Sequence, residues 1–571
     1  MVYLQNYNPL GNAVLSTIVA SLPIVVLLYL IAIHPHTNKT TGRREMGIFA
    51  PFAALSAAAV ALFVAIFVMK MPIPAAFGAF VYGAANGLFP IGWIVFASIF
   101  LYNTTLVSGK FEILKDSVAG LTPDRRLQAL LIAFSFGAFI EGAGGFGAPV
   151  AVSGAIMMGL GFRPLQAAVV CLIANTAPVA WGSIGIPITT LAQVTNIPPE
   201  LISMMAGRQL PLFSIIIPFW LVATLVFMDK GKWRDVFAVW PATLVCGGSF
   251  AATQFFMSQA GNYTLVDIGS GVVSLFTTAL FLRVWKPKNI MYHEDARKEI
   301  PRHTTGAVIN AWMPWVFLAA AVSLWGVPQV KDYLNSIFAC QFNVPGVHGL
   351  VYHTPPVGNN GVTEISEMTA MTAQYKWHIL TMAGTGIMLA AILSGLFVLR
   401  LKREQWGQSM SMTARRMTVP LTVICTVLGL GYLSRYVGTD AILGLAFTKT
   451  GSAYPFFASM LGWLGVLLTG SDTASNAMFG NLQCITAEQL GLNPVLVATA
   501  NSTGGVMGKM LNVQSIIVAT VACYADPKEG MAAIGPIFRA VFWHSIALAV
   551  LLSTFIWLQA GPLSFMQVHL P

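Results

Sequence analysis

Residues 136–149 read Phe-Gly-Ala-Phe-Ile-Glu-Gly-Ala-Gly-Gly-Phe-Gly-Ala-Pro, and residues 470–476 read Gly-Ser-Asp-Thr-Ala-Ser-Asn. Both stretches interrupt long apolar segments with glycines and small residues. Backbone that is not helical at membrane depth leaves unpaired N–H and C=O groups, and it is tolerated only where it is buried in protein or lines a water-filled cavity. The two stretches therefore predict broken membrane helices that form a site.

The composition of the whole chain supports this membrane location. The 571 residues are 56% hydrophobic and 9% charged, whereas an ordinary soluble domain has about 25% charged residues. We therefore predict an all-α integral membrane protein. Ten apolar runs are each long enough to span a bilayer, at about 20 residues per crossing. With the shorter broken segments they predict about 12 to 14 transmembrane segments, including broken or re-entrant helical hairpins.

The distribution of charge predicts the orientation of the chain. The net charge is +10, but most basic residues lie in five loops between apolar runs, so no nucleic-acid surface is indicated. By the positive-inside rule these loops face the cytoplasm. Residues 327–377 contain only two Lys or Arg residues, Lys331 and Lys376, and this segment is therefore expected on the other side of the membrane. The first apolar run precedes the first basic loop and an uncharged tail follows the last run, so both termini are predicted to be extracytoplasmic.

Three landmarks recur in the same order in the two halves of the chain, and they predict a duplication. Each half has a glycine-rich break, then a Gly-x-x-Pro turn, then an Ala-Asn-Ser/Thr step. The first half places them at 142–149, 161–164 and 174–176, and the second half at 470–476, 491–494 and 500–502. Chance recurrence of small residues in apolar segments is the competing explanation. The spacing alone does not tell whether the two repeats are inverted.

This duplication divides the chain into five parts. Residues 1–46 form an N-terminal helix and the first cytoplasmic loop, and residues 47–234 form repeat 1 with a hairpin around 128–160. Residues 235–325 are connecting helices, residues 326–377 an extracytoplasmic loop, and residues 378–571 repeat 2 with a hairpin around 460–490. We expect the two pseudo-symmetric repeats to share one site.

Charged residues inside membrane segments are the sharpest indication of that site. Each costs at least about 2.5–3.5 kcal/mol on insertion scales, so it usually faces a cavity or a partner. Glu141 precedes the first break and Asp472 lies in the second. Both are candidates for proton coupling, with a fixed structural hydrogen bond or an interfacial position as alternatives. Lys509 is a candidate counter-ion to the substrate or to an internal carboxylate, unless its side chain extends to the membrane surface.

The breaks also carry groups suited to binding a small anion. Gly144, Gly145 and Phe146 open the backbone, which could offer N–H groups to an anion as helix N-termini do, although glycines also serve close helix packing. The pattern Gly-x-Gly-x-x-Gly at 142–147 lacks the preceding strand of a nucleotide site. Hydroxyl and amide side chains suit a small polar anion in a tight cavity, and the candidate residues are Asn175, Thr176, Thr473, Ser475, Asn476, Asn501, Thr503 and Gln514.

Other chemistries find no support in the sequence. The six cysteines have no Cys-x-x-Cys spacing and are predicted to be small buried thiols, so neither a disulfide framework nor a metal site is indicated. Paired haem histidines, a cysteine cluster and a soluble nucleotide domain are missing from the sequence. We therefore predict no catalytic residues and no cofactor.

The longest motifs resemble the bacterial L-lactate permease family. They include Phe136–Pro149, Asn175-Thr-Ala-Pro178, Gly182-Ser-Ile-Gly-Ile-Pro187 and Gly462–Asn476. The resemblance extends to Tyr7-Asn-Pro-Leu-Gly11 and Gly207-Arg-Gln-Leu-Pro211, and so runs nearly from end to end. Ala143-Gly144 and Ala474 stand where some members have Ala-Ala and Ser, which are conservative changes.

The resemblance implies a proton symporter for 2-hydroxy monocarboxylates in the bacterial inner membrane. L-lactate is the expected substrate, with D-lactate and glycolate also carried. It further implies inverted repeats with helical hairpins, and by analogy an elevator-like motion. The substrate carboxylate would meet backbone N–H groups at the breaks, Lys509 would offset its charge, and Asp472 or Glu141 would bind the proton. The alternatives are a permease mainly for glycolate or another short hydroxy acid, a passive anion channel, and a membrane-embedded enzyme.

Overall fold

A computed structural model describes residues 2–32, 34–37, 44–46, 50–145, 147–261, 263–292, 301, 303–359, 362 and 364–570. Among these residues, ten helices are long and apolar enough to cross a membrane, or up to twelve if each of two bent helix pairs forms one span. The predicted all-α membrane fold is confirmed. The number of spans is at or below the lower end of the predicted range, because the second arm of each hairpin is either short, as α8 is, or rich in polar residues, as α22 is.

The first half of the chain contains a run of helices that begins at Ala50. They are α2 (Ala50–Phe63), α3 (Ile73–Asn86), α4 (Trp93–Val107), α5 (Lys110–Ala119), α6 (Arg125–Ala129), α7 (Gly137–Gly144), α8 (Ala148–Gly159), α9 (Pro164–Ala174), α10 (Gly182–Thr195), α11 (Pro199–Gln209) and α12 (Pro211–Met228). The second half contains α18 (Ala383–Leu393), α19 (Arg403–Val437), α20 (Thr439–Phe447), α21 (Tyr454–Thr469), α22 (Asp472–Gln489), α23 (Pro494–Gly508), α24 (Val513–Cys523) and α25 (Pro527–Gln559).

The remaining elements precede or connect these two runs. They are β1 (Tyr3–Leu4), α1 (Ala13–Ala32), β2 (Pro35–Thr37), β3 (Arg44–Met46), α13 (Trp233–Phe237), α14 (Trp240–Gln259), α15 (Val266–Val284), α16 (Thr305–Gly326), α17 (Pro328–Ile337), β4 (Cys340–Asn343), β5 (Val351–Tyr352) and β6 (Gln374–Trp377). The strands form three two-stranded sheets: β1 with β5, β2 with β3, and β4 with β6.

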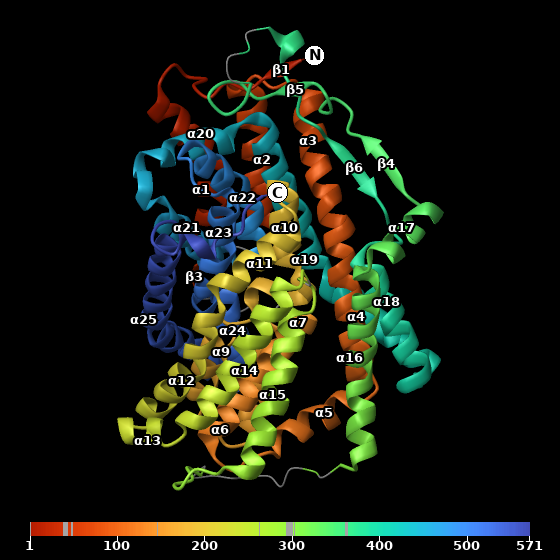
Figure 1. The fold of residues 1–571 in the computed structure, drawn as a ribbon, viewed down its shortest axis with the longest axis vertical. Helices are drawn as coiled ribbons and strands as arrows, with labels where there is room; N and C mark the ends of the chain where they lie inside the picture. The colour runs from red at the N-terminus through yellow and green to blue at the C-terminus, as the bar shows by residue number, and fades with distance from the viewer. Residues whose placement is uncertain are drawn as a thin grey trace.

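The N-terminus and the segment before α18 cover one end of the helices, which we call the amino-terminal face (Figure 1). β1 pairs in parallel with β5, with Tyr3 opposite Val351. The hydroxyl of Tyr3 donates to the carbonyl of Val437 at 3.0 Å, at the end of α19. The opposite face carries α5, α6 and α13 (Figure 1).

The two runs of helices repeat an unusual local structure at a fixed separation. The helix of α2 continues into a π-helical turn at Val64–Val68, and that of α18 into one at Ser394–Val398. Each turn is followed by a basic residue in the left-handed region, Lys70 at φ 58° and Arg400 at φ 50°. All these landmarks recur 330 positions later. A shared deviation of this kind supports the predicted duplication more strongly than recurring glycines do.

The equivalent segments after these turns lie antiparallel, which supports the inverted arrangement. A Cβ added at Gly83 would lie 2.3 Å from the carbonyl oxygen of Leu428, and one at Gly92 would lie 2.5 Å from Leu421. Numbers rise along α3 and α4 while they fall along α19. At the far end, the side-chain amide of Gln405 donates to the carbonyl of Val107 at 3.2 Å.

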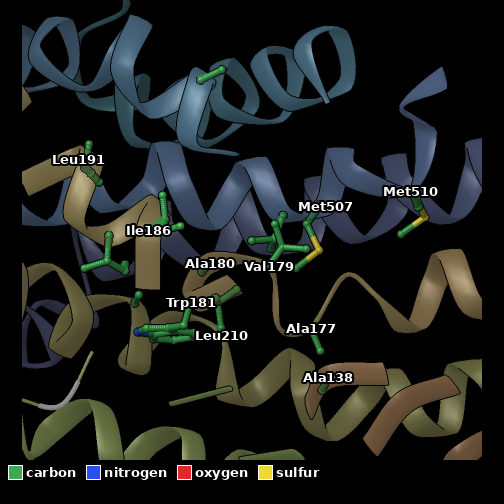
Figure 2. Packing of buried hydrophobic residues seen from close by; sticks show 14 of the residues in the cluster. Ala138, Ala177, Val179, Ala180, Trp181, Ile186, Leu191, Leu210, Met507 and Met510 are labelled. Carbon is green, nitrogen blue, oxygen red and sulfur yellow. The ribbon is translucent and has the colours of Figure 1, made fainter. Parts of the chain in front are cut away.

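Each half also forms a helical hairpin and a broken span. The hairpins are α7–α8 and α21–α22, and the broken spans are α9–α10, bent by 66°, and α23–α24, bent by 43°. The halves exchange partners reciprocally, because α8 packs against α24 and α22 packs against α10. Figure 2 shows apolar side chains filling the contact beside the first break, with Val179 next to Met507 of α23.

We expect the contact between α21 and α23 to tolerate no added methyl group. A Cβ at Gly504 would lie 2.0 Å from the carbonyl oxygen of Ser459. Gly504→Ala should therefore destabilise the protein by about 1–3 kcal/mol, as overpacking does, and lower the temperature at which the protein in detergent loses its helical circular dichroism. The matched control is Gly248→Ala in α14, where nothing lies within 4 Å, and this variant should be at least as stable as wild type. Equal losses in both variants would contradict the close contact.

The amino-terminal face should loosen in acid because of His353. Burial, and then the positive charge of Arg435, lower the pKa of His353 to about 4, from about 6.5 in an unfolded chain. The neutral ring therefore stabilises the folded form fully above pH 6.5, and this contribution is lost as the pH falls towards 4. Hydrogen exchange at residues 2–8 should be faster at pH 4.5 than at pH 7, after correction for intrinsic rates. His353→Gln should abolish that difference, and a difference that persists would exclude His353 as its cause.

Candidate functional site

A cavity of about 240 Å³ lies where both hairpin tips and both broken spans come together. Its polar lining comes from the hairpins and the broken spans, whereas α19 contributes only apolar side chains. The polar residues are Glu141, Ser183, Thr469, Ser471, Asp472, Thr473, Lys509, Asn512, Gln514 and Ser515. The apolar wall comes mainly from the middle of α19, at Val419, Pro420, Val423 and Ile424. The cavity therefore offers separate surfaces to the polar and apolar parts of one small molecule.

The first hairpin contributes a buried carboxyl group. Glu141 lies in the last turn of α7 and is only 4% exposed. Its Oε2 has no hydrogen-bond partner among the residues that the structure describes. Gly182 makes room for this group, because a Cβ there would lie 2.7 Å from Oε1 of Glu141.

The start of α10 is held in a left-handed turn against the hairpin tip. Ser183, Ile184 and Gly185 have φ values of 47°, 60° and 74°. This conformation is rare for a β-branched residue, and non-glycine residues held there cost of order 1–3 kcal/mol each. Gly145 leaves room for this turn, since a Cβ at Gly145 would lie 1.8 Å from the hydroxyl of Ser183.

The second hairpin contributes a helix N-terminus and a second carboxyl group. Gly470 turns the chain at φ 75°, and the hydroxyl of Ser471 accepts from the N–H of Ala474 at 3.2 Å, which caps α22. The first N–H groups of a helix have no partner within the helix, and its dipole favours an anion there. Thr473 in this first turn lines the cavity.

Asp472 is buried, and only one of its two carboxyl oxygens accepts a hydrogen bond from the described residues. Its Oδ2 accepts from the hydroxyl of Ser502 at 2.5 Å, and its Oδ1 has no hydrogen-bond partner in the described part of the chain. Gly505 leaves space for it, because a Cβ there would lie 2.5 Å from Oδ1. Each hairpin thus places a carboxyl group at the same cavity, and each group has one buried oxygen without a hydrogen-bond partner among the described residues.

The bend between α23 and α24 places a lysine at the same cavity as these acids. The ammonium group of Lys509 donates to the carbonyl of Gly470 at 2.7 Å, so it holds the tip of the second hairpin. It acts electrostatically on both Glu141 and Asp472. The side chain of Asn512 caps α24 by accepting from the N–H of Ser515 at 3.2 Å.

The structure brings only some of the predicted site residues to the cavity. Glu141, Asp472, Thr473, Lys509 and Gln514 line it. Phe146 lies outside the described residues. Gly145 acts through its contact with Ser183. The others do not line the cavity in this structure: Gly144, Asn175, Thr176, Ser475, Asn476, Asn501 and Thr503.

Two of these residues, Asn476 and Asn501, instead belong to a buried chain of hydrogen bonds. The hydroxyl of Tyr454 donates to Oε1 of Gln483 at 2.6 Å, and the amide of Gln483 donates to Oδ1 of Asn501 at 3.1 Å. The amide of Asn501 donates to Oδ1 of Asn476 at 2.9 Å, and that of Asn476 donates to the carbonyl of Pro187 at 3.2 Å. This chain ties the second hairpin to α23 and to α10 of the other half.

The sequence analysis missed another buried acid, which lies next to the first hairpin. Asp267 lies in the first turn of α15, is 1% exposed, and neither carboxyl oxygen has a hydrogen-bond partner among the described residues. A Cβ at Gly142 would lie 2.9 Å from the Cβ of Asp267, so this acid adjoins the helix that carries Glu141. It went unnoticed because it stands at the start of an apolar run, where an acid is usually interfacial.

Comparison with known proteins agrees with this architecture. The family model described as L-lactate permease matches residues 16–561. The L-lactate permease of Bacillus subtilis (strain 168) is 41% identical over 99% of this chain and 100% of its own length. The L-lactate permease of Escherichia coli (strain K12) is 40% identical over 98% of this chain and 99% of its own length.

A relative named for a different substrate has a similar level of identity. The glycolate permease GlcA of Escherichia coli (strain K12) is 40% identical over 98% of this chain and 98% of its own length. These relatives are permeases, so the chain is a transporter and not an enzyme. The family match over nearly the whole chain, together with the membrane fold, shows that the chain belongs to the L-lactate permease family of multi-pass membrane transporters.

Proposed function

We propose that this protein carries L-lactate together with a proton across the bacterial inner membrane, and that it also accepts D-lactate and glycolate. One observation carries the proposal. Four breaks, two from each half of the chain, line a single cavity that holds a buried carboxyl group from each hairpin and one lysine. A carrier that concentrates an anion needs such a site between two movable halves, whereas a passive anion channel does not.

The chemistry of the cavity walls suits a short 2-hydroxy acid. The substrate carboxylate would lie at the N-terminus of α22 near Lys509, where the helix dipole and the ammonium group favour negative charge. The hydroxyl would meet groups such as Thr473 and Gln514. The methyl group of lactate would pack against Val423 and Ile424 on the apolar wall. The roles of Gly144, Asn175, Thr176, Ser475, Asn476, Asn501 and Thr503 in binding stay predictions.

The proton would be bound by Glu141 or Asp472. A carboxylate at membrane depth is costly when it is ionised and unpaired, and a proton bound with the substrate lowers the net charge of the loaded site. Asp267 strengthens this argument for Glu141, because two adjoining buried carboxyl groups repel one another when both are ionised. Proton and substrate binding would then be coupled because the positive charge of the proton offsets the negative charge of the substrate in the same cavity.

The orientation follows from the basic loops. The face opposite the amino-terminal face carries Lys110, Lys115, Arg125, Arg126 and Lys232, and the positive-inside rule places such residues in the cytoplasm. The amino-terminal face would then be extracytoplasmic, as would both termini. An elevator-like motion of the hairpins stays a prediction.

Reconstituted protein should take up labelled L-lactate in response to an inward proton gradient. Glu141→Gln or Asp472→Asn should abolish gradient-driven accumulation, because a neutral amide cannot carry the proton. The matched control is Glu488→Gln, at the other end of α22 from Asp472, which should accumulate lactate as wild type does. Symport would be excluded if wild-type uptake of L-lactate were the same with and without the proton gradient. Full accumulation in both site variants would show that neither acid carries the proton.

The apolar wall should discriminate lactate from glycolate, which lacks the methyl group. Unlabelled L-lactate, D-lactate and glycolate should each compete with labelled L-lactate. Val423→Ala should lower the ratio of kcat/KM for lactate to that for glycolate by up to about fourfold, since burying one CH₂ is worth about 0.8 kcal/mol. Glycolate in the same variant is the internal control. Glycolate competing far better than either lactate in wild type would favour a glycolate permease.

A further inference from the structure

A second chamber, of about 500 Å³, opens on the amino-terminal face beside α10. We call it the vestibule, and its walls include Thr189, Gln193, Thr372, Lys376, His378 and Arg435. The same helix, α10, lines the central cavity through Gly182, Ser183, Ile186 and Pro187. The wall between the two chambers is therefore α10, and Pro187 and Thr189 lie only two residues apart on it.

The described lining of the vestibule carries positive charge and no acid. Lys376 and Arg435 line it together with His378, and none of its described lining residues is an aspartate or glutamate. Lys376 is exposed on strand β6, and its ammonium group forms no hydrogen bond or ion pair within the described residues. The central cavity differs in this respect, because Glu141 and Asp472 stand there beside Lys509.

Arg435 also removes the charge that would oppose an anion at this place. The carboxyl end of a helix carries a partial negative charge from its unpaired carbonyl groups. Nη1 of Arg435 donates to the carbonyl of Val194 and to Oδ1 of Asn196, both at 3.3 Å, where α10 ends. The guanidinium thus offsets the negative end of α10 that faces the vestibule. Among the described residues no carboxylate forms an ion pair with it, although the buried Asp440, which does not line the vestibule, acts on it electrostatically.

We propose that the vestibule is a second binding site, which captures short monocarboxylate anions from the amino-terminal side before they reach the central cavity. Cations in a recess of low dielectric focus the electrostatic field and raise the local concentration of an anion. The charges of Lys376 and Arg435 attract any small anion whether or not it carries a 2-hydroxy group, so the vestibule selects mainly for charge and small size, and it accepts formate as well as lactate. The proposal rests on the proposed function for its substrate class.

The kinetic test changes the charge of the vestibule and leaves the central cavity intact. Lys376→Gln should raise KM for lactate uptake from the amino-terminal side about two- to tenfold at low ionic strength, with kcat unchanged. The rise should shrink in 0.5 M salt, and Lys376→Arg should restore the wild-type KM. Lys70→Gln, which removes a charge from the same face outside the vestibule, is the matched control. An unchanged KM in Lys376→Gln, or an equal rise in Lys70→Gln, would overturn the proposal.

A labelling test distinguishes failure of this proposal from failure of the proposed function, because it needs no transport. Thr372→Cys, in a background with Cys340→Ser and Cys425→Ser, keeps every cation of the vestibule. An anionic thiol reagent should label it faster than a cationic reagent of similar intrinsic reactivity does, and both lactate and formate should slow that labelling in a saturable manner. Lys70→Cys should show neither effect. The proposal that the vestibule binds anions would be overturned if the labelling rate of Thr372→Cys did not depend on the charge of the reagent or on added lactate or formate. This holds even if the protein transports lactate.

Discussion

Each broken helix in this protein is covered by a segment of the other half, and the site depends on that coverage. The membrane supplies no water to satisfy an interrupted backbone, so a break survives only when protein surrounds it. The packing of α8 against α24 and of α22 against α10 meets this requirement twice. Neither hairpin could remain open on its own, and the cavity therefore exists only where the two halves come together.

Close approach between backbones makes this coverage possible. Glycines stand at the crossing of α3 with α19 and at that of α21 with α23, where any side chain would overlap a neighbouring carbonyl group. Packing of this kind is how helices associate in lipid, since apolar side chains gain little there from leaving the solvent. The buried side-chain amides of Asn476 and Asn501 then fix how particular helices are aligned, because each of their hydrogen bonds joins one specific pair of helices. Close packing brings the halves together, and hydrogen bonds fix their register.

The sequence predicted the acids and the lysine of the cavity because a charge inside an apolar run is visible without a structure. Glu141, Asp472 and Lys509 were found in this way. The side-chain amides of Asn476 and Asn501 could hydrogen-bond equally well to a substrate or to protein. Only the packing of α22 against α23 and α10 shows that their partners are protein groups. Asp267 was missed for a related reason, because its depth depends on how α15 packs against α7. The antiparallel relation of α3–α4 to α19 also needs contacts between segments far apart in the chain.

The antiparallel contact between α3–α4 and α19 also limits how the chain can change in length. Both segments span 35 residues, from Ile73 to Val107 and from Arg403 to Val437. One inserted residue would rotate everything beyond it by about 100° around the helix axis. Gly83 and Gly92 would then face away from Leu428 and Leu421, and bulkier neighbours would take their places. Insertions and deletions within either segment should therefore be selected against far more strongly than substitutions on their lipid-facing sides.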